Sequence, residues 1–437
     1  MFLTRRFYLV MVAIALVMAS GVLFSPLLVV GQCLLVALGV AVAAEAVVLY
    51  GRCRVTASRT CGDRLSLGDD NEVALEVSNH SRLPLRVEII DELPMQLQQR
   101  HFSLSMAVGA RAAANSVYQL RPTVRGVYEF GHVLVFASTA LGLVQRRFRC
   151  GEPLAVKVYP SFLMLRRYEL MAASDNLVEI GIKRMRRVGT NTEFEQIKDY
   201  VKGDDYRTIN WKATARRGHL MVNVFQDERS QQVFSLIDKG RLMQQAFNGM
   251  TLLDYAINAS LVLSYVVIHR QDKAGLVTFA DRFGSYVPAE RHGAQMQRIL
   301  ECLYAEHTTF GESDYSVLCP SINRLVARRS FMVLYTNFTD FGSLQRQLPY
   351  LQLLNKRHRL LVVFFEDVEL HAYIASTQHS IEEYYQHVIG EKLVYDRRLI
   401  VNTLKQHGIF SLLTTPDHLS VDVINKYLEM KSRQLLV

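Results

Sequence analysis

The sequence has few of the residues and motifs that usually identify an enzyme. It contains one tryptophan, Trp211, in 437 residues, and its six cysteines form no C-x-x-C pair or other metal-binding spacing. The patterns G-x-x-x-x-G-K-[ST], G-x-G-x-x-G, G-x-S-x-G and H-E-x-x-H are absent. Because there is no phosphate-binding loop, we do not expect the chain to hydrolyse ATP. The cysteines fit reduced, structural thiols in a cytoplasmic protein.

Hydrophobic residues make up half of the chain, and the excess lies near the N-terminus. Residues 7–24 and 27–50 are two runs of about 20 apolar residues, each long enough to cross a bilayer core of about 30 Å. Ser25-Pro26 separates them, so the sequence predicts a helical hairpin of two transmembrane helices, with residues 1–54 as the membrane anchor. A cleaved signal peptide is the competing interpretation of the first run. A second apolar run follows it, however, and not a polar mature segment.

The charges around the two runs predict the orientation of the anchor. Arg5 and Arg6 precede the hairpin and Arg52 and Arg54 follow it, whereas the turn between the runs carries no charge. Positive flanks stay inside, so both termini and the soluble domains are expected in the cytoplasm, beneath the inner (cytoplasmic) membrane. Glu45 is the one charged residue within the runs. Its place near the end of the second run favours a position at the membrane interface over a transport role.

Residues 55–160 are expected to form a small antiparallel β-sandwich. Partly alternating strands at 73–77, 85–90 and 127–130 are separated by Gly, Asn, Asp and Pro. We interpret this domain as a structural spacer or docking module.

From residue 230 to residue 437, apolar strands alternate with helices. The strands are expected at 233–237, 275–279, 331–336, 359–365 and 409–415, with an edge strand near 286–287. The helices are expected at 242–269, 294–306, 315–328, 343–356, 381–406 and 419–433. This pattern indicates a doubly wound α/β domain with a largely parallel sheet covered on both faces. Ligands bind such sheets beyond the carboxyl ends of the strands, which here carry Asp238, Thr278, Asp281 and Asn337.

Between these two domains, residues 161–229 concentrate acids, bases and turn residues around Trp211. The run Lys202-Gly203-Asp204-Asp205 is typical of a turn, in which an acid is expected to cap a helix that starts nearby. On that helix Arg207 and Trp211 are four residues apart, which allows a cation–π contact.

Lys212 and Arg216 are also four residues apart, and Arg217 extends the positive face. Like charges at this spacing repel each other and therefore need anions. Two sources of anions remain open, an acidic partner or ligand and a network within the segment. The internal network would use Glu193, Glu195, Asp204 and Asp205.

The segment resembles the signature of the domain-of-unknown-function family fifty-eight. The matching residues are Glu193-Phe194, Asp199-Tyr200, Gly203-Asp204, Arg207-x-Ile209-Asn210-Trp211, Ala215-Arg216, Leu220 and Val224. The sequence departs from the family pattern at Lys198-Asp199. Within this segment we name candidate binding residues and no catalytic residue. The candidates are Glu193, Tyr200, Gly203, Asp204, Arg207, Trp211, Lys212 and Arg216.

The α/β domain resembles a von Willebrand factor type A domain. Such domains carry a metal-dependent adhesion site, D-x-S-x-S, at the end of the first strand, with a Thr and an Asp from later loops. Here Asp238 is kept and both serines are replaced, the first by Gly240, while Thr278 and Asn337 take the later positions. A hard cation such as magnesium needs several oxygen ligands. We therefore predict a degenerate site without a metal.

A positive residue, Arg241, follows Gly240 and is expected to lie close to the former metal position. In the absence of a metal, Asp238 is expected to pair with Lys239, with Arg241 or with a helix N-terminus.

The resemblance implies a membrane-anchored scaffold or adaptor that is not an enzyme and uses no cofactor. It also implies association with a MoxR-type AAA+ ATPase, which would hydrolyse the ATP, and with other membrane proteins in complex assembly or envelope maintenance. An enzyme that acts on a small substrate through the 193–216 segment remains an alternative. A membrane-tethered polyanion binder is another, using the basic clusters at 146–149 and 183–187 within a net charge of +9. No nucleic-acid-binding module accompanies these clusters, so we expect no specific nucleic-acid partner.

Overall fold

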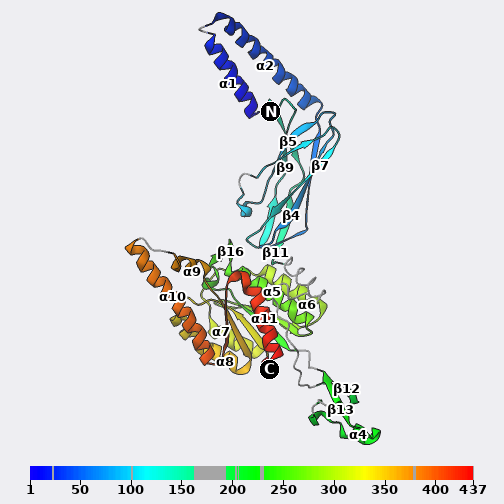
Figure 1. Ribbon diagram of the computed structural model, residues 1–437, viewed down its shortest axis with the longest axis vertical. Helices are drawn as coiled ribbons and strands as arrows, with labels where there is room; N and C mark the ends of the chain where they lie inside the picture. The colour runs from blue at the N-terminus through cyan, green and yellow to red at the C-terminus, as the bar shows by residue number, and fades with distance from the viewer. Residues whose placement is uncertain are drawn as a thin grey trace. The chain divides into compact units, whose positions relative to one another are not determined.

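The computed structural model describes residues 1–21, 24–99, 102–161, 193–201, 204, 206–226, 231–376 and 380–436. They belong to two compact units, Met1–Tyr159 and Pro160–Val437 (Figure 1). The first unit contains a helical hairpin and a strand domain. The second contains the signature segment and an α/β domain. The basic cluster at 183–187 lies outside the described residues.

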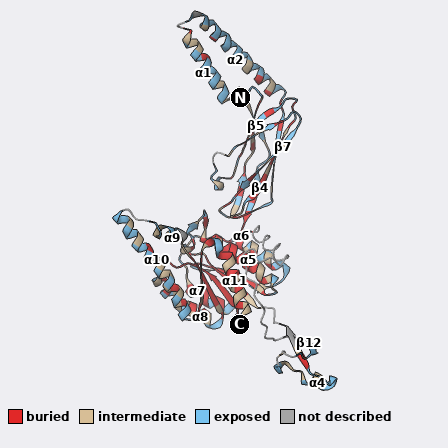
Figure 2. Cartoon of the chain, viewed as in Figure 1, coloured by how far each residue is buried: buried red, intermediate tan, exposed pale blue. Residues whose placement is uncertain are grey.

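The chain begins with two antiparallel helices, α1 (Arg5–Ser20) and α2 (Ser25–Gly51). Gly31 of α2 allows them to approach closely, because a Cβ at this position would lie 2.4 Å from Cγ of Met18 in α1. Most side chains of α2 are exposed (Figure 2). By length and composition, the stretch Pro26–Gly51 is able to cross a membrane. The 16 residues of α1 extend for about 24 Å, somewhat less than a bilayer core.

Helix α5 (Leu252–His269) is also long and apolar enough to pass this test, but 78% of its apolar window is buried inside the second unit. It is therefore a core helix of the α/β domain.

The strand domain of the first unit consists of three sheets whose buried residues alternate with exposed ones, as in β4. One sheet has the order β1 (Phe2–Leu3), β10 (Val144–Cys150), β9 (Val133–Ser138), β5 (Leu85–Asp91) and β6 (Leu104–Val108). A second consists of β2 (Val55–Cys61), β4 (Asn71–Asn79) and β7 (Ala113–Leu120). The third consists of β3 (Arg64–Ser66), β11 (Leu154–Tyr159) and β8 (Gly126–Phe130). The three strands expected from the sequence lie within β4, β5 and β8.

Asp91, at the end of β5, links the first two sheets. Its carboxylate forms an ion pair with Arg59 of β2 and accepts a hydrogen bond from the hydroxyl of Tyr118 in β7. These three polar groups are paired inside the domain, which avoids the cost of burying them alone.

Both ends of the hairpin are attached to β10. Strand β1, which leads into α1, pairs with β10 through Leu3 and Val144. At the other end, Arg146 of β10 donates hydrogen bonds to the carbonyl oxygens of Leu49 and Tyr50, at 2.7 and 3.1 Å. These are carbonyl groups of the last turn of α2, which have no partner within the helix.

Glu45 is a second attachment of α2. Its carboxylate accepts hydrogen bonds from the backbone N–H groups of Gly142, Leu143 and Val144 and from the hydroxyl of Thr139. The residue is only 3% exposed. Its position is therefore set by the loop between β9 and β10, which spacing along the helix could not indicate.

The second unit has a six-stranded sheet with the order β18-β17-β14-β19-β20-β21. All neighbours are parallel except β17 and β18. The strands are β14 (Gln232–Asp238), β17 (Lys273–Phe279), β18 (Phe283–Glu290), β19 (Phe331–Tyr335), β20 (Arg359–Phe365) and β21 (Phe410–Thr414). The sheet has the doubly wound topology that the sequence predicts, with the order reversing at β14.

Helices cover both faces of this sheet, and successive residues of β14 enter different cores. Val233 packs with residues of α5, α6 (Gly293–Ala305) and α11 (Leu419–Ser432). Phe234 packs with residues of α7 (Tyr315–Leu325), α8 (Phe341–Arg357) and α10 (Ile381–Gln406). A shorter helix, α9 (Val368–Ile374), follows β20.

The first helix of this domain begins later than the sequence suggests. It starts at Leu252, where the side chain of Thr251 caps it by accepting a hydrogen bond from the backbone N–H of Asp254. The preceding residues form a short 3-10 turn and a hairpin, β15 (Ala246–Phe247) and β16 (Met250–Thr251). Asn248-Gly249 forms its turn with positive φ at both residues, the backbone that an Asn-Gly pair favours.

Candidate functional site

The signature segment folds as a strand hairpin that carries one short helix. Strands β12 (Glu193–Asp199) and β13 (Met221–Gln226) are antiparallel, and a 3-10 turn (Tyr206–Thr208) and α4 (Trp211–Arg217) lie between them. We call this element the signature hairpin. Tyr200 is half-buried, and its backbone N–H donates to the carbonyl oxygen of Leu220.

The residue that caps the helix is Asn210, not an acid of the preceding turn. Its side-chain oxygen accepts from the backbone N–H of Ala213 at 2.9 Å, and its amide donates to Asn223 of β13 at 2.7 Å. The expectation of a helix starting near residues 202–205 is therefore wrong. The Asn residue directly before Trp211 is a strong capping signal that the sequence already contained.

Asp204 has a different role. Its carboxylate accepts from the backbone N–H of Val201 at 3.0 Å and pairs with Lys198 at 3.1 Å. The hydrogen bond from Val201 and, to a smaller extent, the interaction with Lys198 hold the pKa of Asp204 below its usual value. Part of the predicted internal network is thus present. Gly203, with Lys202 and Asp205, lies outside the described residues, as does the side chain of Glu193.

The helix presents a surface of aromatic and basic side chains. Trp211 is 70% exposed and Tyr206 is 69% exposed. Lys212 and Arg216 are exposed on the same short helix, at the four-residue spacing that the sequence predicts, and Arg217 is exposed beside them. Within the part of the chain that the structure describes, no carboxylate forms an ion pair with these three cations. We call Tyr206, Trp211, Lys212, Arg216 and Arg217 the α4 surface.

The proposed contact between Arg207 and Trp211 is not formed. Arg207 lies in the 3-10 turn before the helix, and its guanidinium is 5.9 Å from the ring centre of Tyr206. Because α4 begins only at Trp211, the two residues do not share a helical face.

The second candidate region is the carboxyl edge of the α/β sheet. Asp238, at the end of β14, is 2% exposed. Its carboxylate accepts hydrogen bonds from the hydroxyls of Ser313 and Thr336, at 2.5 and 2.7 Å, and from the backbone N–H of Gly240, at 2.8 Å. Burial raises the pKa of Asp238, although these hydrogen bonds oppose the shift.

Of the three partners expected for Asp238, a helix N-terminus fits the hydrogen bond from Gly240, which precedes the 3-10 turn Arg241–Met243, whereas Lys239 and Arg241 do not pair with it. Lys239 forms an ion pair with Glu306 at 2.6 Å, and the side chain of Arg241 is exposed. Sequence reasoning missed Ser313, Thr336 and Glu306. No signal near Asp238 could have identified them, because Ser313 precedes α7 and Thr336 follows β19.

Ser313 occupies the space in which the adhesion motif would place its first serine. A Cβ on Gly240 would lie 1.9 Å from Oγ of Ser313 and 3.0 Å from Oδ1 of Asp238. The hydroxyl partner of Asp238 is thus supplied by a different loop, and residue 240 must remain small.

Thr278 and Asn337 do not contact Asp238 in the described interactions. The hydroxyl of Thr278 donates to Glu306 at 2.9 Å and accepts from the backbone N–H of Ser285. Asn337 accepts a hydrogen bond from the backbone N–H of Phe338. The residues predicted for one adhesion site are therefore divided among separate networks.

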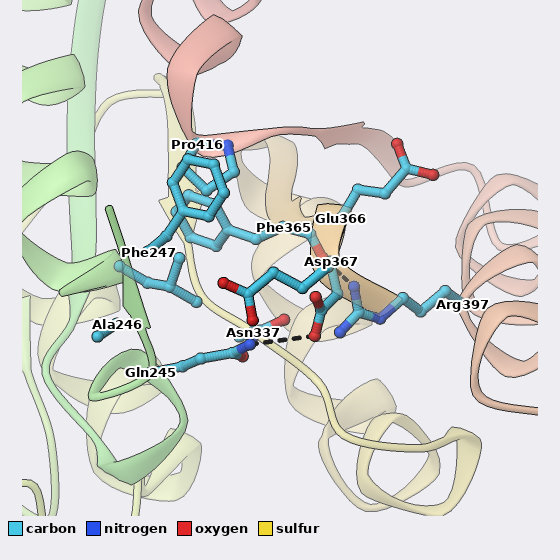
Figure 3. A pocket seen from close by; sticks show the side chains of 11 residues that line it. Gln245, Ala246, Phe247, Asn337, Phe365, Glu366, Asp367, Arg397 and Pro416 are labelled. Atoms are coloured by element: carbon cyan, nitrogen blue, oxygen red, sulfur yellow. Dashed lines mark hydrogen bonds between the residues drawn. The ribbon is translucent and has the colours of Figure 1, made fainter. Parts of the chain in front are cut away.

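Asn337 borders a small pocket beyond the carboxyl ends of β19, β20 and β21 (Figure 3). Gln245 donates to the carboxylate of Asp367 at 3.1 Å, and Arg397 donates to the carbonyl oxygen of Phe365 at 2.8 Å. Gln245, Asp367 and Arg397, which line this pocket, are thus bonded within the protein.

Among the described residues, no group of three or more His, Cys, Asp and Glu side chains is arranged to hold a metal ion. The carboxylate oxygens of Asp238 accept hydrogen bonds from two hydroxyls and one backbone N–H. The neighbouring residue, Lys239, forms its ion pair with Glu306.

Comparison with solved structures gives weak similarity. An aerotolerance-related membrane protein from Bacteroides fragilis NCTC 9343 is 11% identical with a TM-score of 0.30, covering 47% of this chain and 99% of that chain. Proximal thread matrix protein 1 from the mussel byssus is 12% identical with a TM-score of 0.29, covering 46% of each chain. At these scores the likeness supports no conclusion about activity.

Comparison with protein sequences gives two matches. The Uncharacterized protein YeaD of Bacillus subtilis (strain 168) is 27% identical over 126 residues, which cover 28% of this chain and 30% of that protein. The chain therefore matches less than a third of the length of this curated relative. Residues 196–371, which include most of the signature hairpin and part of the α/β domain, match the family described as "Protein of unknown function DUF58".

Proposed function

We propose that this protein is a membrane-anchored adaptor that binds a partner protein through the α4 surface. The observation that carries the proposal is the exposure of Trp211 beside Lys212, Arg216 and Arg217, none of which has an anionic partner among the described residues. Tryptophan and arginine are the residues that most often dominate the binding energy of protein interfaces. The positive charge of Lys212, Arg216 and Arg217 favours an acidic patch on the partner.

The construction of the signature hairpin supports a docking role. Two strands and a helix of 7 residues bury little apolar surface, and isolated two-stranded hairpins are only marginally stable in water. Binding a partner would remove Trp211 and Tyr206 from water and so stabilise the hairpin together with the complex.

The α/β domain serves in this proposal as a scaffold of the type A kind. The sheet order and the antiparallel edge strand β18 support this resemblance. The bonded network around Asp238 supports a structural role for that residue, since its acceptor atoms are already engaged. On this basis we propose that the chain is not an enzyme.

We further propose that the hairpin of α1 and α2 spans the inner membrane twice, with both termini in the cytoplasm. The apolar length of α2 and the arginines on both flanks support this topology. The partner that the family resemblance implies is a MoxR-type AAA+ ATPase, together with other membrane proteins whose assembly it serves.

Crosslinking in membranes tests the adaptor. Partners are co-purified with the full chain, with Trp211→Ala/Arg216→Glu and with a matched control. The control is Tyr395→Ala/Arg398→Glu, which alters an exposed aromatic residue and an exposed arginine on α10. We expect to recover an AAA+ ATPase with the full chain and with the control. The α4 variant should give at least a tenfold lower yield, which corresponds to about 1.4 kcal/mol of binding free energy. Equal recovery with all three chains would exclude the α4 surface as the docking site.

A further inference from the structure

The end of the β-sandwich that receives the helical hairpin is rich in arginine. The start of β5 and the ends of β4, β6 and β9 lie at this end, as the registers of their pairing show. The β9–β10 loop, which binds Glu45, lies beside them. The flanks of the hairpin contribute Arg5, Arg6, Arg52 and Arg54. We call this region the anchor end.

The strand domain adds further arginines to the anchor end. Arg82 lies in the loop between β4 and β5, and Arg86 lies near the start of β5. Arg111 lies between β6 and β7, and Arg147 lies on β10. All four side chains are exposed. None forms an ion pair with a residue that the structure describes.

The anchor end contains almost no negative charge. Residues 1–6, 52–55, 78–86, 108–113 and 137–147 include no Asp or Glu. The acid that reaches this region is Glu45, and its carboxylate is occupied by Thr139 and three backbone N–H groups. A single carboxylate cannot balance the charge of all these arginines.

The opposite end of the sandwich differs because it carries acids as well as bases. The turn between β3 and β4 carries Asp69 and Asp70, and Asp63, Glu72, Glu92 and Glu152 lie at the same ends of neighbouring strands. Arg64, Arg121, Arg125 and Arg149 lie at this end too, so its charges are mixed, whereas the anchor end is almost purely positive.

We propose that the anchor end binds the phosphate headgroups of anionic phospholipids in the membrane that holds the hairpin. This inference rests on the membrane anchoring proposed above and adds the class of lipid. Arginine is suited to the role because its planar guanidinium donates paired hydrogen bonds to phosphate oxygens. The hairpin places these arginines beside the helix ends, at the depth of the headgroups.

The lipids around the full chain test this proposal. The protein is reconstituted in vesicles of equal parts phosphatidylcholine and phosphatidylglycerol and extracted with a styrene–maleic acid copolymer. The phosphatidylglycerol content of the particles is then measured by mass spectrometry. The test variant is Arg82→Gln/Arg86→Gln/Arg111→Gln, whose side chains are exposed and make no described ion pair. The control, Arg64→Gln/Arg121→Gln/Arg149→Gln, removes the same charge elsewhere on the domain.

We expect the wild-type and control particles to be enriched in phosphatidylglycerol over the vesicles, and the test variant to lose at least about half of this enrichment. Higher ionic strength should lower the wild-type enrichment. Particles without enrichment, or equal enrichment in the test variant and wild type, would overturn the proposal. Extraction with alkaline carbonate separates the two hypotheses. A protein released by carbonate contradicts membrane anchoring itself, whereas a retained protein without lipid preference contradicts only the headgroup site.

Discussion

The carboxylate of Glu45 in α2 accepts a hydrogen bond from the backbone N–H of Leu143, 98 residues further along the chain, at 2.9 Å. Two neighbouring N–H groups and the hydroxyl of Thr139 bind the same carboxylate. Hydrogen bonds to an ionised acceptor are about twice as strong as neutral ones. The hairpin and the strand domain are therefore joined directly through this carboxylate.

We predict that Glu45→Ala loosens this junction. The substitution leaves three backbone N–H groups and one hydroxyl without their acceptor, and each buried unpaired group costs about 1–3 kcal/mol. Hydrogen exchange of residues 142–144 in the full chain should become at least tenfold faster, with smaller changes in β4 and β7. Glu45→Gln, which keeps one carbonyl oxygen as acceptor, should give an intermediate result. Unchanged protection of Leu143 in the alanine variant would show that the carboxylate does not hold this loop.

We predict that restoring the first serine of the adhesion motif destabilises the protein. In Gly240→Ser the new Cβ would lie 1.9 Å from Oγ of Ser313, so the variant should lose about 1–3 kcal/mol through overpacking. The backbone is not the obstacle, because Gly240 has a φ of −76° that serine readily adopts.

The double variant Gly240→Ser/Ser313→Gly supplies the control. It removes the clash and allows the new hydroxyl to reach Asp238 in place of the old one. Thermal unfolding followed by circular dichroism should show that the second substitution recovers most of the lost stability. Simple additivity of the two single effects would contradict a shared space around Asp238.

The α/β sheet was predictable from the sequence because its strands are apolar throughout and buried on both faces, as at Val233 and Phe234. The start of α5 was not found, because apolar periodicity extended across the Asn248-Gly249 turn and hid it. That dipeptide is a hairpin signal in its own right and would have corrected the boundary.

The candidate sites were less predictable because their partners come from distant segments. Asp238 was identified at the end of its strand, but Ser313 and Thr336 reach it only through the folded sheet. Charge alone suggested Lys239 as its partner, whereas Lys239 is taken by Glu306. The four-residue spacing that brings Lys212 and Arg216 together depends only on the local helix, so the sequence was sufficient to predict it.

We predict that His358 makes the α/β domain less stable in mild acid. The side chain is 1% exposed, and neither ring nitrogen has a hydrogen-bond partner among the described residues. Burial, aided by the charges of Arg357 and Arg329, lowers the pKa of His358 from 6.5 to about 4. The folded state therefore binds this proton less readily than the unfolded state. Stability is lost as the pH falls from about 6.5 to about 4, by on the order of 3 kcal/mol.

The variant His358→Phe isolates this effect, since it keeps a ring but cannot be protonated. Melting temperatures of the full chain at about pH 7.5 and about pH 5 give the comparison. The wild type should lose several degrees more than the variant between these two conditions. Equal losses would mean that His358 does not contribute to acid sensitivity.

We predict that Asn210 controls partner binding without contacting the partner. Its side chain caps α4 through Ala213 and ties the helix to Asn223. Asn210→Ala should destabilise the helix by about 1 kcal/mol, so that Trp211 and Arg216 are no longer held on one surface. The yield of crosslinked partner should fall although every residue of the α4 surface is retained, and exchange of the Ala213 amide should rise.

Asn210→Ser is the matched control, because serine is also a good capping residue but does not donate to Asn223 through an amide. It should preserve the helix and most of the crosslinking yield. If Asn210→Ala releases the Ala213 amide while the yield stays at the wild-type level, the partner does not depend on an ordered α4. Docking would then have to be assigned to another part of the chain.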